Sequence, residues 1–178
     1  MKTSFFIGCF ILIFSPLQAQ NWELGVKGGL NIAKVRVVND DDRSSKLGAN
    51  LGGFIRTDLS DNMDIQGEVQ LSFQGWDGVN VTYINIPVVV KYYVAEQFDV
   101  FAGPQLGLLV SAEGNREPLL NETDIGINFG AEYHINEIIG VGANFNTGLS
   151  NVLIDDEGNR KFRNRVFQVF VAYRLSPK

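Results

Sequence analysis

Few side chains in this sequence are suited to catalysis. His134 is the only histidine and Cys9 the only cysteine among 178 residues. A nucleophilic serine needs its base within hydrogen-bond reach, roughly 2.6–3.2 Å. The candidate serines, Ser111 and Ser150, fall at the opposite ends of the predicted strands from His134. We therefore interpret His134 as a packed residue of the interior or rim, and we expect no catalytic residue and no enzyme activity.

Two acidic segments could attract a metal ion. Residues 40–42 are three consecutive aspartates, and residues 155–159 read Asp-Asp-Glu-Gly-Asn. Calcium prefers hard oxygen ligands of this kind, but a dedicated calcium loop spaces them in a set order that neither segment follows. We interpret both segments as solvated loops and expect neither a metal site nor a cofactor.

Other charged side chains recur on one face of stretches in which polar and apolar residues alternate. They are Glu23, Lys27, Arg56, Glu68, Lys91, Glu132 and Arg174. The clearest stretch is residues 65–74, where the even positions are polar and the odd positions are mainly apolar. Strict alternation is typical of a β-strand whose two faces meet different surroundings.

Eight stretches alternate in this way, each about 10 to 14 residues long, whereas strands of ordinary globular proteins are nearer 5–6. They cover residues 22–33, 47–59, 65–74, 84–93, 100–110, 125–134, 139–149 and 167–175. A strand that crosses a membrane needs roughly 9–11 residues. On the polar face of the second stretch we expect Asn50, Arg56 and Asp58. Length and even number predict an all-β fold, an eight-stranded antiparallel up-and-down transmembrane β-barrel.

The connections between the stretches differ in length in a regular way. Long polar connections are expected at residues 39–46, 111–123 and 151–163, and a medium one at 77–80. Short ones are expected at residues 60–62, 95–97 and 136–137. Outer-membrane barrels have short periplasmic turns and longer external loops. This asymmetry predicts that both ends of the barrel domain lie in the periplasm.

The N-terminus has the features of a secretory signal peptide. Lys2 is followed by an apolar run over residues 5–14 and by the small residue Ala19. The run is too short for a membrane-spanning helix, which takes about 20 residues. We expect residues 1–19 to be removed together with Cys9, leaving residues 20–178 as an outer-membrane β-barrel domain. Loss of Lys2 would change the formal net charge from −5 to −6, which argues against a nucleic-acid partner.

The two faces of a barrel can be arranged in two ways. A soluble ligand-binding barrel turns its apolar face inward, whereas an outer-membrane barrel turns it outward into lipid. The charged faces here also carry glycines, at positions 25, 29, 48, 52, 103, 107, 126, 130, 140 and 142. An eight-stranded barrel is just wide enough for side chains to fill, so large polar groups need such small neighbours. We therefore favour the membrane barrel, with a lumen closed by a network of amide side chains and of ion pairs among the seven charged residues above.

Aromatic residues gather near the ends of the stretches, as in the interfacial girdles of membrane barrels. Near the short connections lie Trp22, Tyr92, Tyr93, Phe98, Tyr133 and Tyr173, and near the longer ones lie Phe73, Trp76 and Tyr83. Pro87 and Pro104 fall inside the fourth and fifth stretches. Since proline cannot donate to a strand ladder, we expect a bulge or local break at each.

Several runs together resemble the PorT-like outer-membrane β-barrel family, also described as the outer membrane protein beta-barrel domain. They are residues 25–31, 83–92, 102–107, 124–130, 146–151 and 172–175. The resemblance extends over the whole mature chain, although Leu175-Ser176-Pro177-Lys178 departs from the terminal aromatic residue common in outer-membrane proteins. It implies an outer-membrane location and an eight-stranded barrel. It implies no single activity, although some members are linked to protein secretion.

The function expected from the sequence is that of a non-enzymatic, monomeric outer-membrane barrel with a structural or loop-mediated interaction role. Its partners would be outer-membrane lipid and an extracellular or envelope protein that meets the loops at residues 39–46, 111–123 and 151–163. Three alternatives stay open at this point. They are a small channel, an accessory component of an outer-membrane secretion system, and a soluble periplasmic ligand-binding barrel.

Overall fold

The computed structural model describes residues 22–37, 45–76, 79–112, 121–150 and 162–176, which form eight β-strands. The strands are β1 (Glu23–Val37), β2 (Lys46–Ser60), β3 (Met63–Trp76), β4 (Val79–Ala95), β5 (Phe98–Ala112), β6 (Thr123–His134), β7 (Ile139–Gly148) and β8 (Phe162–Arg174). They are 10 to 17 residues long, so β1, β2, β4 and β5 exceed the length expected from the sequence. Within these ranges, no helix is long and apolar enough to span a membrane.

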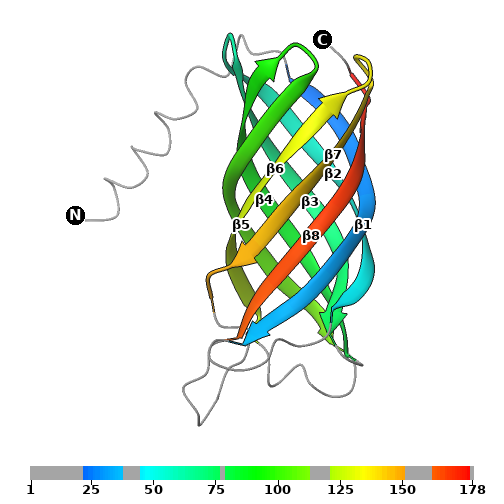
Figure 1. Ribbon diagram of the computed structural model, residues 1–178, viewed down its shortest axis with the longest axis vertical. Helices are drawn as coiled ribbons and strands as arrows, with labels where there is room; N and C mark the ends of the chain where they lie inside the picture. The colour runs from blue at the N-terminus through cyan, green and yellow to red at the C-terminus, as the bar shows by residue number, and fades with distance from the viewer. Residues whose placement is uncertain (1–21, 38–44, 77–78, 113–120, 151–161, 177–178) are drawn as a thin grey trace, which may run out of the picture.

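The strands close into a single barrel. Each strand pairs antiparallel with its neighbours in the sequence, and β1 also pairs with β8 over thirteen residue pairs, from Gly25 with Arg174 to Val37 with Phe162. Figure 1 shows the closed wall, with tilted strands and no free edge in the described part. The predicted eight-stranded antiparallel barrel is therefore confirmed.

The two ends of the barrel differ. At one end, which we call the turn end, residues 61–62, 96–97 and 135–138 join consecutive strands, and β1 begins and β8 ends there (upper end in Figure 1). At the other, the loop end, β3 and β4 are separated by residues 77–78 alone, so the predicted connection at 77–80 is shorter than expected. The three long predicted loops lie mostly outside the described residues, as does the predicted signal peptide.

Apolar side chains cover the outer wall, and polar side chains fill the inside. Leu30, Leu51 and Val171 are 55%, 66% and 52% exposed, whereas Lys91 and Gln70 are buried. The backbone amides are paired around the closed wall, so such a surface can face hydrocarbon. The alternative of a soluble barrel with its apolar faces inward is therefore wrong, because the alternation places those faces outside.

Three residues depart from their predicted positions. Asp58 was expected on the inward face, but it is exposed beside the turn end, where the β2–β3 register shifts between Asp58 and Ser60. Tyr83 and Tyr93 were expected in the outer aromatic girdles. Tyr83 is instead buried, and the Tyr93 hydroxyl donates to Asp64 in the lumen over 2.6 Å. Both tyrosines share the strand face of Lys91, and that alternation decides their direction.

The two prolines coincide with gaps in the ladders. Between β3 and β4 the paired residues step from Gln70–Asn85 to Gly67–Val88 and omit Pro87. Between β4 and β5 they step from Pro87–Gln105 to Val90–Ala102 and omit Pro104. The register is the same on both sides of each gap. The proline positions therefore carry local breaks, without a bulge.

Candidate functional site: a layered lumen

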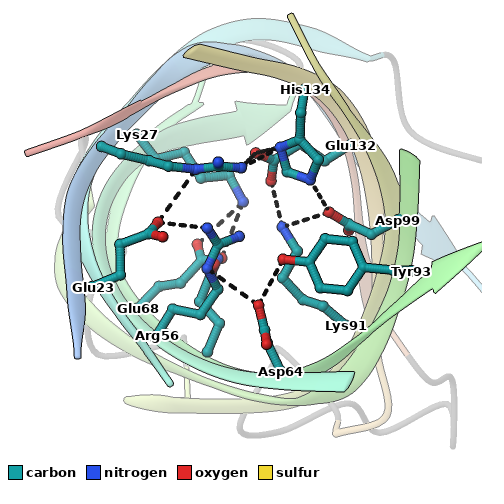
Figure 2. A network of polar contacts seen from close by, with 12 residues as sticks. Glu23, Lys27, Arg56, Asp64, Glu68, Lys91, Tyr93, Asp99, Glu132 and His134 are labelled. Atoms are coloured by element: carbon teal, nitrogen blue, oxygen red, sulfur yellow. Dashed lines mark hydrogen bonds and ion pairs between the residues drawn. The ribbon is translucent and has the colours of Figure 1, made fainter. Parts of the chain in front are cut away.

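Charged and polar side chains form a ring at the turn end of the lumen, which we call the turn-end ring. Its members are Glu23, Arg56, Asp64, Lys91, Tyr93, Asp99, Glu132, His134 and Arg174. Every strand except β7 contributes at least one of them. Figure 2, which looks into the barrel, shows most of these side chains pointing toward one another around the interior.

One arc of the ring is organised by Arg56. Its Nη2 atom lies 2.5 Å from Oε1 of Glu23, and its Nε atom lies 3.5 Å from Oδ2 of Asp64. Arg174 extends the arc, since its Nε atom lies 3.3 Å from the same Glu23 oxygen. Glu23, Arg56 and Asp64 are all buried. Two guanidinium groups therefore share one carboxylate at the point where β1 meets β2 and β8.

The opposite arc is organised by Lys91. Its ammonium lies 2.5 Å from Oε2 of Glu132 and 3.1 Å from Oδ2 of Asp99. His134 joins the arc through Nε2, 2.7 Å from the same Asp99 oxygen, and through Nδ1, which contacts Nη2 of Arg174. A guanidinium has no acceptor, so Nδ1 accepts and Nε2 donates to Asp99. His134 thereby links the two arcs.

Glycines on β7 make room for the ring. A Cβ atom on Gly140 would lie 2.1 Å from Oε1 of Glu132, and one on Gly142 would lie 2.5 Å from the ring of Phe170. The strand without a charged member thus provides the space into which the side chains of β6 and β8 extend. A strand glycine is otherwise unfavourable, and here packing supplies the reason for it.

A second layer lies deeper and centres on Glu68. Lys27 on β1 binds both of its carboxylate oxygens, at 3.1 and 3.2 Å. Gln66 donates to Oε1 over 2.7 Å, and Gln70 donates to Oε2. The carboxylate is thus surrounded by one cation and two amides, which provides the hydrogen bonds that a buried ion requires.

Apolar side chains form an aromatic layer that lies beside the second layer, since Phe54 pairs with Glu68 in the β2–β3 ladder. Phe54, Val89, Phe101, Phe170 and Ala172 form one buried cluster. The ammonium of Lys27 lies 3.9 Å from the ring centroid of Phe170 and 5.5 Å from that of Phe101. Cations bind the faces of aromatic rings at such distances. This aromatic layer was not among the residues predicted from the sequence to fill the lumen, and it gives Lys27 a second kind of partner.

Amide side chains fill the lumen toward the loop end. Asn144 donates to Asn128 and Gln168, each over 3.0 Å, and Asn164 on β8 donates to Gln74 on β3 over 2.7 Å. The last bond joins strands that are not neighbours in the sheet, so it crosses the interior. Nearer the loop end, Ser150 donates to the buried carboxylate of Asp124 over 2.6 Å.

The structure brings all seven sequence-predicted site residues into the lumen. Glu23, Lys27, Arg56, Glu68, Lys91 and Glu132 are buried, and the side chain of Arg174 is 11% exposed. The prediction omitted Asp64 and Asp99, which are equally buried. Both continue the alternation of their strands. Asp64 lies two residues before Gln66 on the inward face of β3, and Asp99 lies two residues before Phe101 on the inward face of β5. Extending each strand to its turn would have found them.

The turn-end ring and the second layer together hold nearly balanced charge. The carboxylates are those of Glu23, Asp64, Glu68, Asp99 and Glu132, and the cations are Lys27, Arg56, Lys91 and Arg174. Such a set can hold its members in one arrangement, since each buried charge has a partner of opposite sign. Within the described ranges, no group of three or more histidine, cysteine or acidic residues is arranged to hold a metal ion.

An apolar outer wall, a closed antiparallel sheet and a filled polar interior define this protein as a transmembrane β-barrel. The family model of the outer membrane protein beta-barrel domain matches residues 18–153. The chain belongs to that family and is an outer-membrane protein.

Solved structures share the fold. The attachment invasion locus protein Ail of Yersinia pestis is similar with a TM-score of 0.56 and 11% identity, over 86% of this chain and 98% of that one. Neisserial surface protein A is similar with a TM-score of 0.53 and 10% identity, over 84% and 96% of the two chains. No curated protein matches this sequence significantly. At such identities the likeness concerns the fold alone.

Proposed function

We propose that this protein is a non-enzymatic, monomeric barrel that presents its external loops from the outer membrane and does not conduct solutes. The single observation that carries the proposal is the layering of the lumen. From the turn end, the ring of ion pairs is followed by the Lys27–Glu68 pair with its aromatic neighbours, and then by amides toward the loop end. Side chains of each kind meet across the interior. A wall of eight strands leaves little room beyond such side chains.

A planar-bilayer recording of the purified full chain tests this closure. We expect no discrete conductance steps in the native protein. Glu68 and Lys27 can be replaced together by alanine to remove the central ion pair, and this variant shows whether the assay detects an opened lumen. Reproducible openings in the native protein would instead favour the small channel.

The absence of catalysis in this proposal is supported by the place of His134. Its two ring nitrogens are engaged by Asp99 and Arg174 at the turn end. Ser150, at the loop end, donates to Asp124. The histidine is thus committed to the turn-end ring and the serine to another partner. Incubation of the protein with labelled phospholipid and lipopolysaccharide should leave both unmodified.

The proposed orientation places the turn end in the periplasm. The loop asymmetry supports this orientation, and the signal peptide predicted at residues 1–19 would export the chain to the periplasm. The loops at residues 39–46, 111–123 and 151–163 would then face the cell exterior, where a protein partner can reach them. An accessory role in outer-membrane protein secretion is the second candidate, because some members of the PorT-like family that the sequence resembles are linked to secretion. Deletion of the gene followed by an assay of exported proteins distinguishes the two.

A further inference from the structure

The outer wall carries a recess near the turn end. It has a volume of about 550 Å³ and lies on the lipid-facing side of β1 to β4. Outward apolar side chains and two outward glycines make up most of its lining: Leu24, Gly53, Ile55, Gly67, Val69, Ile86 and Leu175. The inward-facing residues Gly25, Phe54 and Glu68 also border it. We propose that this recess binds one acyl chain of a glycerophospholipid from the membrane leaflet at the turn end.

Gly53 and Gly67 create the recess without any steric need for glycine. A Cβ on Gly53 would meet nothing nearer than the Gly25 carbonyl at 3.6 Å, and one on Gly67 nothing nearer than Ile55 at 3.9 Å. The lumen glycines differ, since a Cβ on Gly29 would lie 2.0 Å from the Val169 carbonyl. Glycine weakens a strand interior relative to alanine by roughly 0.5–1 kcal/mol. Two wall glycines that have room for a Cβ are therefore best explained by a need to keep the recess open.

The ladder places the two glycines side by side with bulky neighbours. Gly53 pairs with Val69, and Gly67 pairs with Ile55. Each glycine is thus flanked by a large apolar side chain on the adjoining strand. The recess runs across β2 and β3 at the two glycines, and the side chains of Ile55 and Val69 form its sides. At the turn end, the Leu175 amide donates to the Leu24 carbonyl over 2.8 Å, which holds the end wall in place.

An acyl chain fits this recess better than the wall of a second barrel. The lining is almost entirely apolar and lies within the lipid-facing belt, so its occupant is apolar as well. Close contact between membrane segments needs small residues that let two backbones approach, but the ridges of Leu24, Ile55 and Val69 would hold a convex wall away. A single hydrocarbon chain can lie between them. Nearby, Trp22 and Tyr173 are 43% and 47% exposed on the same outer face, and such residues sit at the level of lipid headgroups.

Photo-crosslinking in vesicles tests the proposal. The full chain is inserted into vesicles of phosphatidylethanolamine and phosphatidylglycerol that contain phosphatidylethanolamine with a diazirine on one acyl chain. Adducts are mapped by mass spectrometry. We expect several-fold more adducts on the recess residues than on the outer wall around Ala102 of β5. Gly53→Leu with Gly67→Leu should abolish the excess, and the control Ala102→Leu, which adds similar bulk elsewhere on the wall, should keep it.

Several outcomes would overturn the proposal. They are an even distribution of adducts around the barrel, an excess that persists when both glycines are replaced by leucine, and crosslinks at the recess between two protein chains. Heat-modifiable migration reports whether each variant is folded. If the double leucine variant does not fold, Gly53→Ala with Gly67→Ala places only two methyl groups in open space, and it should lower the excess without affecting folding. No loss with that folded variant would also reject the proposal.

Discussion

Lys27 and Glu68 form an ion pair across the lumen between strands that are not neighbours. The Lys27 Nζ atom binds both Glu68 oxygens, at 3.1 and 3.2 Å, and the two residues lie on β1 and β3. The residue between them on β2, paired with Lys27 in the ladder, is Gly52. Because Gly52 has no side chain, the lysine can extend over β2 to reach the carboxylate. One glycine thus permits the central contact of the lumen.

Removal of the lysine charge should destabilise the barrel strongly. Lys27→Met leaves Glu68 buried without its cation, and loss of one partner from a buried pair costs about 3–5 kcal/mol. Urea unfolding from lipid vesicles, followed by tryptophan fluorescence, measures the change. The double variant Lys27→Met with Glu68→Met should recover most of the lost stability, since it leaves no unpaired charge. Equal loss in the single and double variants would contradict this account, and Glu96→Gln at an exposed turn serves as control.

Substitutions of glycine by alanine should differ in sign between the lumen and the wall. Gly29→Ala places a Cβ 2.0 Å from the Val169 carbonyl, and overpacking of this kind costs about 1–3 kcal/mol. Gly53→Ala meets open space and should gain about 0.5–1 kcal/mol by restricting the unfolded chain. The same unfolding assay measures both. A similar gain at the two positions would show that strand glycine acts through the backbone alone, and a similar loss would contradict the open space beside Gly53.

The aromatic layer should contribute to stability through packing and through Lys27. Phe170→Ala leaves a cavity in the buried cluster and removes the ring face nearest to the ammonium, and we expect a loss of about 3–5 kcal/mol. Phe129→Ala, on the exposed outer wall beside Phe145, is the matched control and should cost less. An equal loss of stability in the two variants would mean that burial of Phe170 in the lumen adds nothing to its contribution.

Single cysteines should distinguish the wall from the lumen. Leu71→Cys replaces an exposed wall residue and Gln70→Cys its buried neighbour. A maleimide dissolved in the membrane should modify position 71 and leave position 70 unmodified in the folded protein. Both should react after unfolding. Modification of position 70 alone in the folded protein would reverse the assignment of the faces.

The proposed orientation predicts which end of the barrel can be labelled from outside the cell. Glu122→Cys lies at the loop end and Asp61→Cys in a short turn. A membrane-impermeant maleimide applied to intact cells should label position 122 and should reach position 61 only after the outer membrane is permeabilised. Labelling of position 61 alone in intact cells would mean that the barrel has the opposite orientation, with its turn end facing the cell exterior.

The sequence by itself determined the strands and their faces. In a strand successive side chains point to opposite sides, so alternation assigned Leu71 to the wall and Gln70 to the interior before any contact was known. The even number of long strands predicted a closed up-and-down barrel with both ends on one side. The prediction erred where the alternation was not carried through, as with Tyr83, or where the register shifts near a turn, as with Asp58.

Only the tertiary structure decided which inward residues meet. Lys27 pairs with Glu68, which is 41 positions away, although Glu23 lies on its own strand face. Phe54, Phe101 and Phe170 come from β2, β5 and β8 and share one layer. The level that a residue occupies in a barrel depends on the stagger of all eight strands around the closed sheet. That stagger is a property of the assembled ladders, and no single stretch of sequence contains it.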